Sequence, residues 1–273
     1  MLKFFINLLL VALMTLPLTV FAKSQNLWID GDHGKLSAVI QTPDKKSSYP
    51  LVILCHGFTG HKNSPILMPI ADKLEAAGIA SIRFDFNGHG NSEGSFTDMT
   101  IVNEISDALK VYDYAVNLPQ VTSVAIAGHS QGGVVASMLA GQLGADKIKA
   151  LALMAPAAVL RDYAIHGNLF GYTYDPISPP DYVEIYDGFK VGRGYILTTQ
   201  TLPIYETAAK YKGPALMVHG TDDKVVPYKY SLRYQEIYPN SKVELLQNFD
   251  HGFRPDINKA TQMVADFFIN NLK

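Results

Sequence analysis

A serine between two glycines is the residue of this chain best placed for nucleophilic chemistry. The stretch Gly128-His129-Ser130-Gln131-Gly132 has the form G-x-S-x-G and lies between an apolar run (123–127) and a helix-like run (132–143). A strand, a sharp turn and a helix in this order expose the serine hydroxyl above the sheet edge. Glycines flank the serine because so tight a turn leaves no room for side chains. The pattern predicts Ser130 as a nucleophile.

The nucleophile needs a base, because a lone serine hydroxyl reacts poorly. His251 is the expected base. It lies in the loop Asn248-Phe249-Asp250-His251-Gly252-Phe253, directly after the strand-like run 242–246. An imidazole in this position can take the serine proton and later deliver it to the leaving group.

A third group must orient the base, and an acidic loop supplies two candidates. His219-Gly220-Thr221-Asp222-Asp223 follows the strand-like run 214–218. The spacing H-G-x-x-D favours Asp223 over its neighbour Asp222. Asp250 adjoins the base in sequence, but neighbouring side chains in a loop usually point apart. The order Ser, Asp, His along the chain is the one expected of an α/β-hydrolase.

An oxyanion hole is expected from two backbone N–H groups, those of Phe58 and Gln131. Phe58 lies in His56-Gly57-Phe58-Thr59-Gly60, which follows the apolar strand 51–55, and Gln131 opens the helix after the nucleophile. Each such donor can stabilise a transition state by about 3–4 kcal/mol, and the helix N-terminus adds positive potential. For the nearby His56 and His129 we expect structural hydrogen bonds.

The order of the elements predicts an α/β fold. Strand-like and helical runs alternate along most of the chain, which indicates a mostly parallel sheet covered by helices on both faces. Ligands of such sheets bind at the carboxyl ends of the strands. The runs are two short antiparallel strands (27–29 and 35–40), buried strands (51–55, 79–84, 124–127 and 148–154) and helices (65–77 and 99–116).

The alternation breaks between Pro156 and Pro214. This segment is rich in Tyr, Gly and Pro, and aromatic residues at such a density usually bury surface. We therefore interpret residues 156–213 as a small cap inserted over the site. The helical run 204–211 returns the chain to the sheet.

Composition limits the partners. A chain of 273 residues suffices for one large domain, and a net charge of −2 without a Lys/Arg cluster argues against nucleic-acid binding. Cys55 is the only cysteine, so no disulfide can form within the chain. The histidines lack metal-ligand spacing, so neither a metal nor a nucleotide cofactor is expected. A homodimer stays open as an alternative to a monomer.

The N-terminus has the pattern of a secretory signal. Met1-Leu2-Lys3 precedes an apolar run (4–21) that ends in Val20-Phe21-Ala22, with small residues where a signal peptidase cuts. We expect cleavage after Ala22, a mature domain over residues 23–273, export to the periplasm or medium, and no stable membrane association afterwards. The alternative is an uncleaved membrane helix, since about 18 apolar residues nearly span a bilayer.

Several longer stretches resemble feruloyl (cinnamoyl) esterases of the α/β-hydrolase superfamily, which are related to the serine aminopeptidase-like hydrolases. The resemblance covers nearly the whole mature chain and implies the same roles for Ser130, Asp223, His251, Phe58 and Gln131. The stretches are HGFTGHKNS (56–64), RFDFNGHGNSEG (83–94), GHSQGGVVASMLAG (128–141), LMAPAA (153–158), LPIYE (202–206), HGTDDKVVPYKYS (219–231) and DHGF (250–253).

The same resemblance implies a cap that grips a phenolic ring. Tyr195 matches a cap tyrosine that hydrogen-bonds a ring hydroxyl, and Asp162 is a second candidate for substrate binding. The stretch Leu160–Gly171 departs from the family pattern, with Tyr163 and Phe170 at positions expected to be polar. A more apolar pocket favours less hydroxylated aromatic or short acyl esters.

Three hypotheses follow for the function. The leading one is a serine carboxylesterase that cleaves a small ester through an acyl-enzyme. A serine peptidase or amidase is the second, although the cap shows no acidic cluster for a free amino terminus. The third is a non-catalytic binding protein on a hydrolase scaffold, against which the complete set of triad residues argues.

Overall fold

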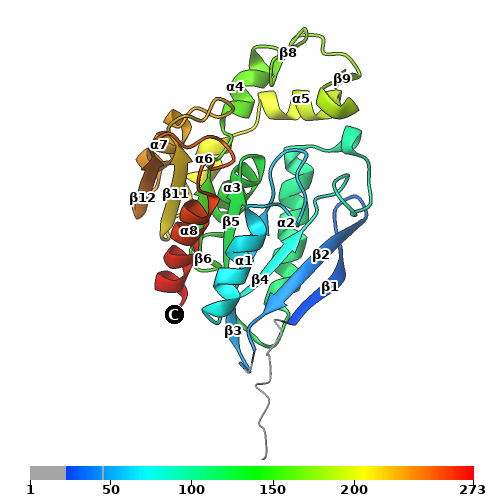
Figure 1. Cartoon of the computed structure of the whole chain (residues 1–273). Coiled ribbons are helices and arrows are strands. Elements are labelled where there is room, and N and C mark those ends of the chain that lie inside the picture. The colour runs from blue at the N-terminus through cyan, green and yellow to red at the C-terminus, as the bar shows by residue number, and fades with distance from the viewer. Residues whose placement is uncertain (1–22, 45) are drawn as a thin grey trace, which may run out of the picture.

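The computed structural model describes residues 23–44 and 46–273, so the predicted signal segment 1–22 lies outside it. Its centre is an eight-stranded sheet with the order β1-β2-β4-β3-β5-β6-β11-β12 (Figure 1). The strands are β1 Lys23–Asp30, β2 Lys35–Thr42, β3 Tyr49–Cys55, β4 Ala80–Phe84, β5 Val121–His129, β6 Ile148–Met154, β11 Ala215–Gly220 and β12 Ser241–Leu246. From β4 to β12 neighbouring strands are parallel, whereas β2 pairs antiparallel with both β1 and β4. The predicted α/β fold is confirmed.

Helices cover both faces of this sheet because its central strands are apolar on both sides. In β3, Leu51 and Ile53 face one buried cluster, and Val52 and Leu54 face the other. Helices α1 and α8 cover the second of these faces, and α2, α3, α6 and α7 cover the first. Their bounds are α1 Leu67–Ala76, α2 Ile101–Val116, α3 Gln131–Leu143, α6 Ile204–Ala208, α7 Lys229–Ile237 and α8 Ile257–Leu272.

The C-terminal helix α8 is an element that the sequence interpretation missed. Asp256 accepts a hydrogen bond from the Lys259 N–H and caps its first turn. Ala260, Val264 and Phe268 recur at helical spacing and are fully buried. Both signals are present in the sequence. Within the described residues, no helix combines the length and apolar character needed to cross a bilayer.

Residues 156–213, the cap segment, connect β6 to β11. Much of this segment lies beyond one end of the sheet, where Figure 1 shows α4, β8, β9 and α5 together. It contains α4 Val159–Ile165, the short strands β7 Asn168–Leu169, β8 Tyr172–Thr173, β9 Tyr182–Glu184 and β10 Lys190–Gly192, and α5 Arg193–Gln200. These strands form two separate two-stranded sheets, so the cap segment does not extend the central sheet.

Candidate active site

Ser130 lies at the turn between β5 and α3, as predicted. Its backbone has φ 55° and ψ −121°, a conformation that side-chain-bearing residues adopt only under strain. Two glycines make the turn possible. A Cβ on Gly132 would lie 2.2 Å from the His56 carbonyl oxygen, and one on Gly128 would lie 2.0 Å from the Gly132 oxygen. The first turn of α3 thus packs closely against the end of β3, and this close packing holds the strained serine in place.

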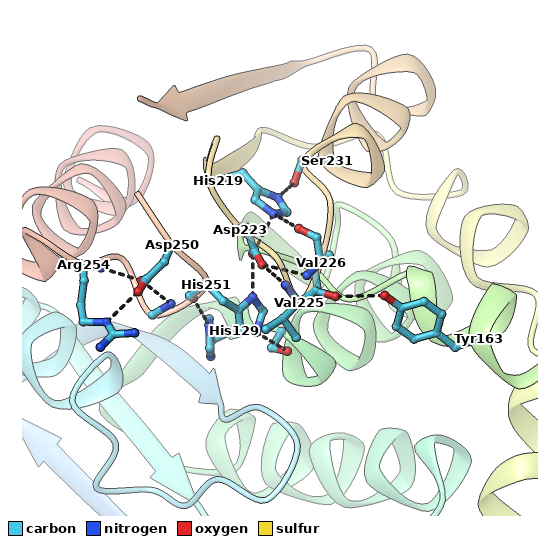
Figure 2. A network of polar contacts seen from close by, with 12 residues as sticks. His129, Tyr163, His219, Asp223, Val225, Val226, Ser231, Asp250, His251 and Arg254 are labelled. Carbon is cyan, nitrogen blue, oxygen red and sulfur yellow. Dashed lines mark hydrogen bonds and ion pairs between the residues drawn. The ribbon is translucent and has the colours of Figure 1, made fainter. Parts of the chain in front are cut away.

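Ser130 and His251 are 121 residues apart in sequence, yet their side chains are in contact. The distance from His251 Nε2 to Ser130 Oγ is 2.9 Å, and His251 Nδ1 lies 2.7 Å from Asp223 Oδ2. Figure 2 shows His251 against Asp223, with the residues that support both loops. The three predicted triad residues are therefore brought together as one hydrogen-bonded chain.

The structure gives different partners to the three acidic residues Asp222, Asp223 and Asp250. Asp222 is exposed and pairs with Lys224, and Asp250 contacts Arg254 instead of His251 (Figure 2). Asp223 is 7% exposed, and its Oδ1 accepts the N–H groups of Val225 and Val226 at 2.8 Å each. Burial acts to raise the pKa of the Asp223 carboxyl, but hydrogen bonds from His219, His251 and Val226 outweigh it and lower that pKa. Asp223 is thus a buried anion facing the imidazole.

His129 supports the loop that carries His251. Its Nε2 lies 3.0 Å from the carbonyl oxygen of His251, an acceptor, so Nε2 is the protonated nitrogen. Burial, and then the neighbouring His251, lower the pKa of His129 to about 3. The neutral ring therefore acts as a hydrogen-bond donor. His56 has a comparable place, since its Nε2 accepts the Phe86 N–H at 3.1 Å. Both histidines make the structural hydrogen bonds expected of them.

The two predicted oxyanion donors are free to bind a ligand. In the described part of the chain, the N–H groups of Phe58 and Gln131 donate to no other protein group. Phe58 lies in a loop with a left-handed turn at Thr59 (φ 55°), closed by a hydrogen bond from Gly60 N–H to Gly57 O. Phe58 and Ser130 line the same pocket.

A buried ion pair anchors the loop that contains Phe58. Lys62 Nζ lies 2.6 Å from Asp85 Oδ2, and the Lys62 N–H donates to Asp85 Oδ1 at 2.6 Å. Both side chains are almost fully buried. Burial acts to raise the pKa of Asp85, but hydrogen bonds from Asn91 and Lys62 lower it. A charged pair thus fixes the position of the Phe58 loop. The sequence interpretation quoted both stretches but missed this contact.

The pocket beside Ser130 has a volume of about 460 Å³ and mostly apolar walls. Phe58 and the cap residue Phe170 form one wall, with ring centroids 5.0 Å apart. Tyr186 supplies a hydroxyl group to the wall, and this hydroxyl lies 3.2 Å from that of Thr59. The lining residues are Gly57, Phe58, Gly60, Ser64, Pro65, Ile66, His129, Ser130, Phe170, Tyr186, Val225, His251 and Gly252.

The two cap residues predicted to bind substrate have other surroundings. Tyr195 is 1% exposed, and its hydroxyl donates to Gln131 Oε1 at 2.8 Å. The Gln131 amide in turn donates to both carboxyl oxygens of the buried Glu104 at 2.9 Å. Asp162 is exposed and accepts a hydrogen bond from the Tyr230 hydroxyl. Neither Tyr195 nor Asp162 lines the pocket, and protein partners already engage their polar groups.

Comparisons with known proteins identify the superfamily of the chain. Residues 46–174 match the family model described as serine aminopeptidase, S33. The solved structure of Est1E from Butyrivibrio proteoclasticus with bound ferulic acid is similar at 35% sequence identity and a TM-score of 0.86, over 90% of this chain and 98% of that chain. The chain belongs to the α/β-hydrolase superfamily.

More distant relatives differ in how much of their length is shared. The hydrolase is 23% identical over 248 residues to the palmitoyl-protein thioesterase ABHD10 of Bos taurus, covering 83% of this chain and 74% of that protein. It is 33% identical over 81 residues to an uncharacterized 31.7 kDa protein of Escherichia coli. That alignment spans only 28% of the Escherichia coli protein, so it relates part of each chain.

Proposed function

We propose that this α/β-hydrolase is a serine carboxylic ester hydrolase for small aromatic, hydroxycinnamate-like or short acyl esters. The observation that carries the proposal is the double contact of His251, 2.9 Å from Ser130 Oγ and 2.7 Å from Asp223 Oδ2. An imidazole between a hydroxyl and a buried carboxylate is the arrangement that makes serine nucleophilic.

The proposed reaction has two halves. Ser130 Oγ attacks the ester carbonyl while His251 takes its proton, and the N–H groups of Phe58 and Gln131 stabilise the tetrahedral oxyanion. His251 then protonates the departing alcohol and leaves an acyl group on Ser130. In the second half, His251 activates a water molecule that releases the acid. Asp223 orients the imidazole and stabilises its charged form.

The pocket supports a neutral substrate. Three of its lining residues have ionisable side chains: His129, Tyr186 and His251. An aminopeptidase would need an acidic group for a free amino terminus, and the described pocket wall contains no Asp or Glu. This favours esters over aminoacyl amides. Est1E, whose structure contains ferulic acid, supports an aromatic acyl group.

The test is turnover by Ser130→Ala of p-nitrophenyl acetate and butyrate, methyl cinnamate, methyl ferulate and an aminoacyl anilide. We expect the wild type to cleave the esters faster than the anilide, and Ser130→Ala to lose about 10⁴-fold or more in kcat. The exposed Ser48→Ala is the matched control and keeps full activity. A fluorophosphonate probe should label the wild type at Ser130. Unchanged rates in Ser130→Ala refute the proposal, and an unlabelled wild type favours a binding protein.

A further inference from the structure

A second histidine lies behind the acid of the triad, and no step of the proposed reaction uses it. His219 is the penultimate residue of β11 and is 0% exposed. Its Nε2 lies 3.1 Å from Asp223 Oδ2, the same oxygen that faces His251 (Figure 2). One carboxylate oxygen is therefore shared by two imidazoles.

The other contacts of His219 fix its ring and its tautomer. Nε2 also lies 2.8 Å from the carbonyl oxygen of Val226, so both of its partners are acceptors and Nε2 carries a proton. On the opposite side, Nδ1 lies 2.7 Å from Oγ of Ser231, which is fully buried on α7. Ser231 Oγ is thus within hydrogen-bond distance of Nδ1. The imidazole thus joins β11, the acid loop and α7.

We propose that His219 is a positioning residue for Asp223. It holds the shared oxygen Oδ2 of Asp223 in line with His251, and it limits how strongly this oxygen accepts a hydrogen bond from His251. This inference rests on the proposed function. The other oxygen of Asp223 is held by two backbone N–H groups of its own loop. His219 therefore supplies the side-chain donor to Oδ2 that comes from outside both catalytic loops.

The expected effect has a definite sign. A carboxylate that loses a hydrogen-bond donor holds more negative charge on its free lone pair and stabilises a neighbouring imidazolium more strongly. Without His219, His251 should keep its proton to higher pH. The other titratable groups facing this pair are His129, which burial keeps neutral, and Tyr163, whose pKa is raised by burial and then by Asp223. Neither changes charge between pH 4 and 8.

Two variants of residue 219 separate positioning from packing. Glutamine places an N–H close to the position of Nε2, whereas leucine fills the space without a donor. For His219→Leu we expect the midpoint of the acid limb of kcat/KM to rise by roughly 0.5–1 pH unit, together with about a tenfold loss on the plateau. His219→Gln should restore both towards the wild type. Ser231→Ala should shift the midpoint in the same direction by less.

Two readouts make the outcome decisive. Fluorophosphonate titration normalises each rate to the folded, reactive fraction, and NMR titration of histidine ring resonances gives the His251 midpoint without any turnover. An unmoved midpoint in His219→Leu, or in Ser231→Ala if the leucine variant does not fold, overturns the inference and leaves His219 a packing residue. Failure of the proposed function has a different signature, because the wild type itself would then cleave no ester.

Discussion

The loops around Ser130 and the cap segment above them are built in opposite ways. Lys62, Asp85 and Asp223 in the loops and His219 at the adjoining end of β11 are buried, and each makes several hydrogen bonds. The cap segment has strands of two or three residues and exposes large apolar side chains, with Ile177 93% exposed. Dense buried hydrogen bonding resists local opening, whereas short, exposed elements permit it. Ser130, Asp223 and His251 thus lie on the fixed part, and the cap segment contributes Phe170 and Tyr186 to the pocket from the adaptable part.

Among the contacts that join the two regions, one chain of hydrogen bonds is fully buried. The hydroxyl of Tyr195 in the cap segment reaches Gln131, which follows the nucleophile, and Gln131 is held by Glu104 of α2. All three side chains are about 1% exposed. The position of α5 is therefore tied to the first turn of α3, where an oxyanion donor is expected.

The largest effect should come from the buried ion pair. Lys62→Met leaves Asp85 as a buried anion without its cation, so we expect the free energy of unfolding to fall by about 3–5 kcal/mol, with a lower kcat because the Phe58 loop loosens. The matched control is Arg161→Met, which breaks the exposed pair with Glu206 and should cost about 1 kcal/mol or less. Urea denaturation measures both. Equal losses in the two variants would remove the contrast between the regions.

An intermediate, pH-dependent effect is expected at Glu104, which holds Gln131 in the contact between the two regions. Burial raises the pKa of Glu104 well above its usual value, although the Gln131 hydrogen bond lowers it in part. The folded state therefore binds this proton more tightly than the unfolded chain. Its stabilising effect is present below about pH 4.3, the pKa in an unfolded chain, and is lost as pH rises to the folded pKa.

Glu104→Gln tests that sign, because glutamine does not titrate. We compare the free energy of unfolding of the variant with that of the wild type. The difference should increase by about 1.4 kcal/mol for each pH unit between the unfolded and the folded pKa of Glu104, because the wild type loses stability over that range. Urea denaturation at pH 4, 6 and 8 measures it, with the exposed Glu236→Gln as control. A difference that is constant or falls with pH contradicts a raised pKa of Glu104.

The smallest effect belongs to the cap segment. Tyr186→Phe removes a pocket hydroxyl that contacts Thr59 but leaves the ring in place. Loss of one hydrogen bond of about 1 kcal/mol predicts a rise in KM of about fivefold for methyl ferulate, with kcat and methyl cinnamate nearly unchanged. A large fall in kcat for both esters would show that Tyr186 supports the chemistry itself and would blur the division between the regions.

Much of the fold and the reacting groups could be predicted from sequence. The alternation of apolar runs with helical runs located β3 to β6 and the first three large helices within a few residues, since local periodicity depends only on neighbouring residues. Ser130 and His251 follow from motifs at strand ends. α8 was missed although its cap and spacing are visible, and the short cap strands have too few residues for a periodic signal.

The amino-acid sequence by itself determined which residues could react and that they lie at one edge of a parallel sheet, because strand direction orders the loops. The H-G-x-x-D spacing favoured Asp223 over Asp222, and the tertiary structure supplied the physical distinction, since Asp223 is buried against His251 whereas Asp222 is exposed and pairs with Lys224. Only the tertiary structure placed Tyr195 and Asp162 away from the pocket and set His219 behind the acid. The partners of Tyr195 and Asp162 are 64 and 68 residues away in sequence, and long-range pairing of this kind leaves no local pattern in the chain. His219 and Asp223 are only four residues apart, but the turn that brings their side chains together depends on packing against α7.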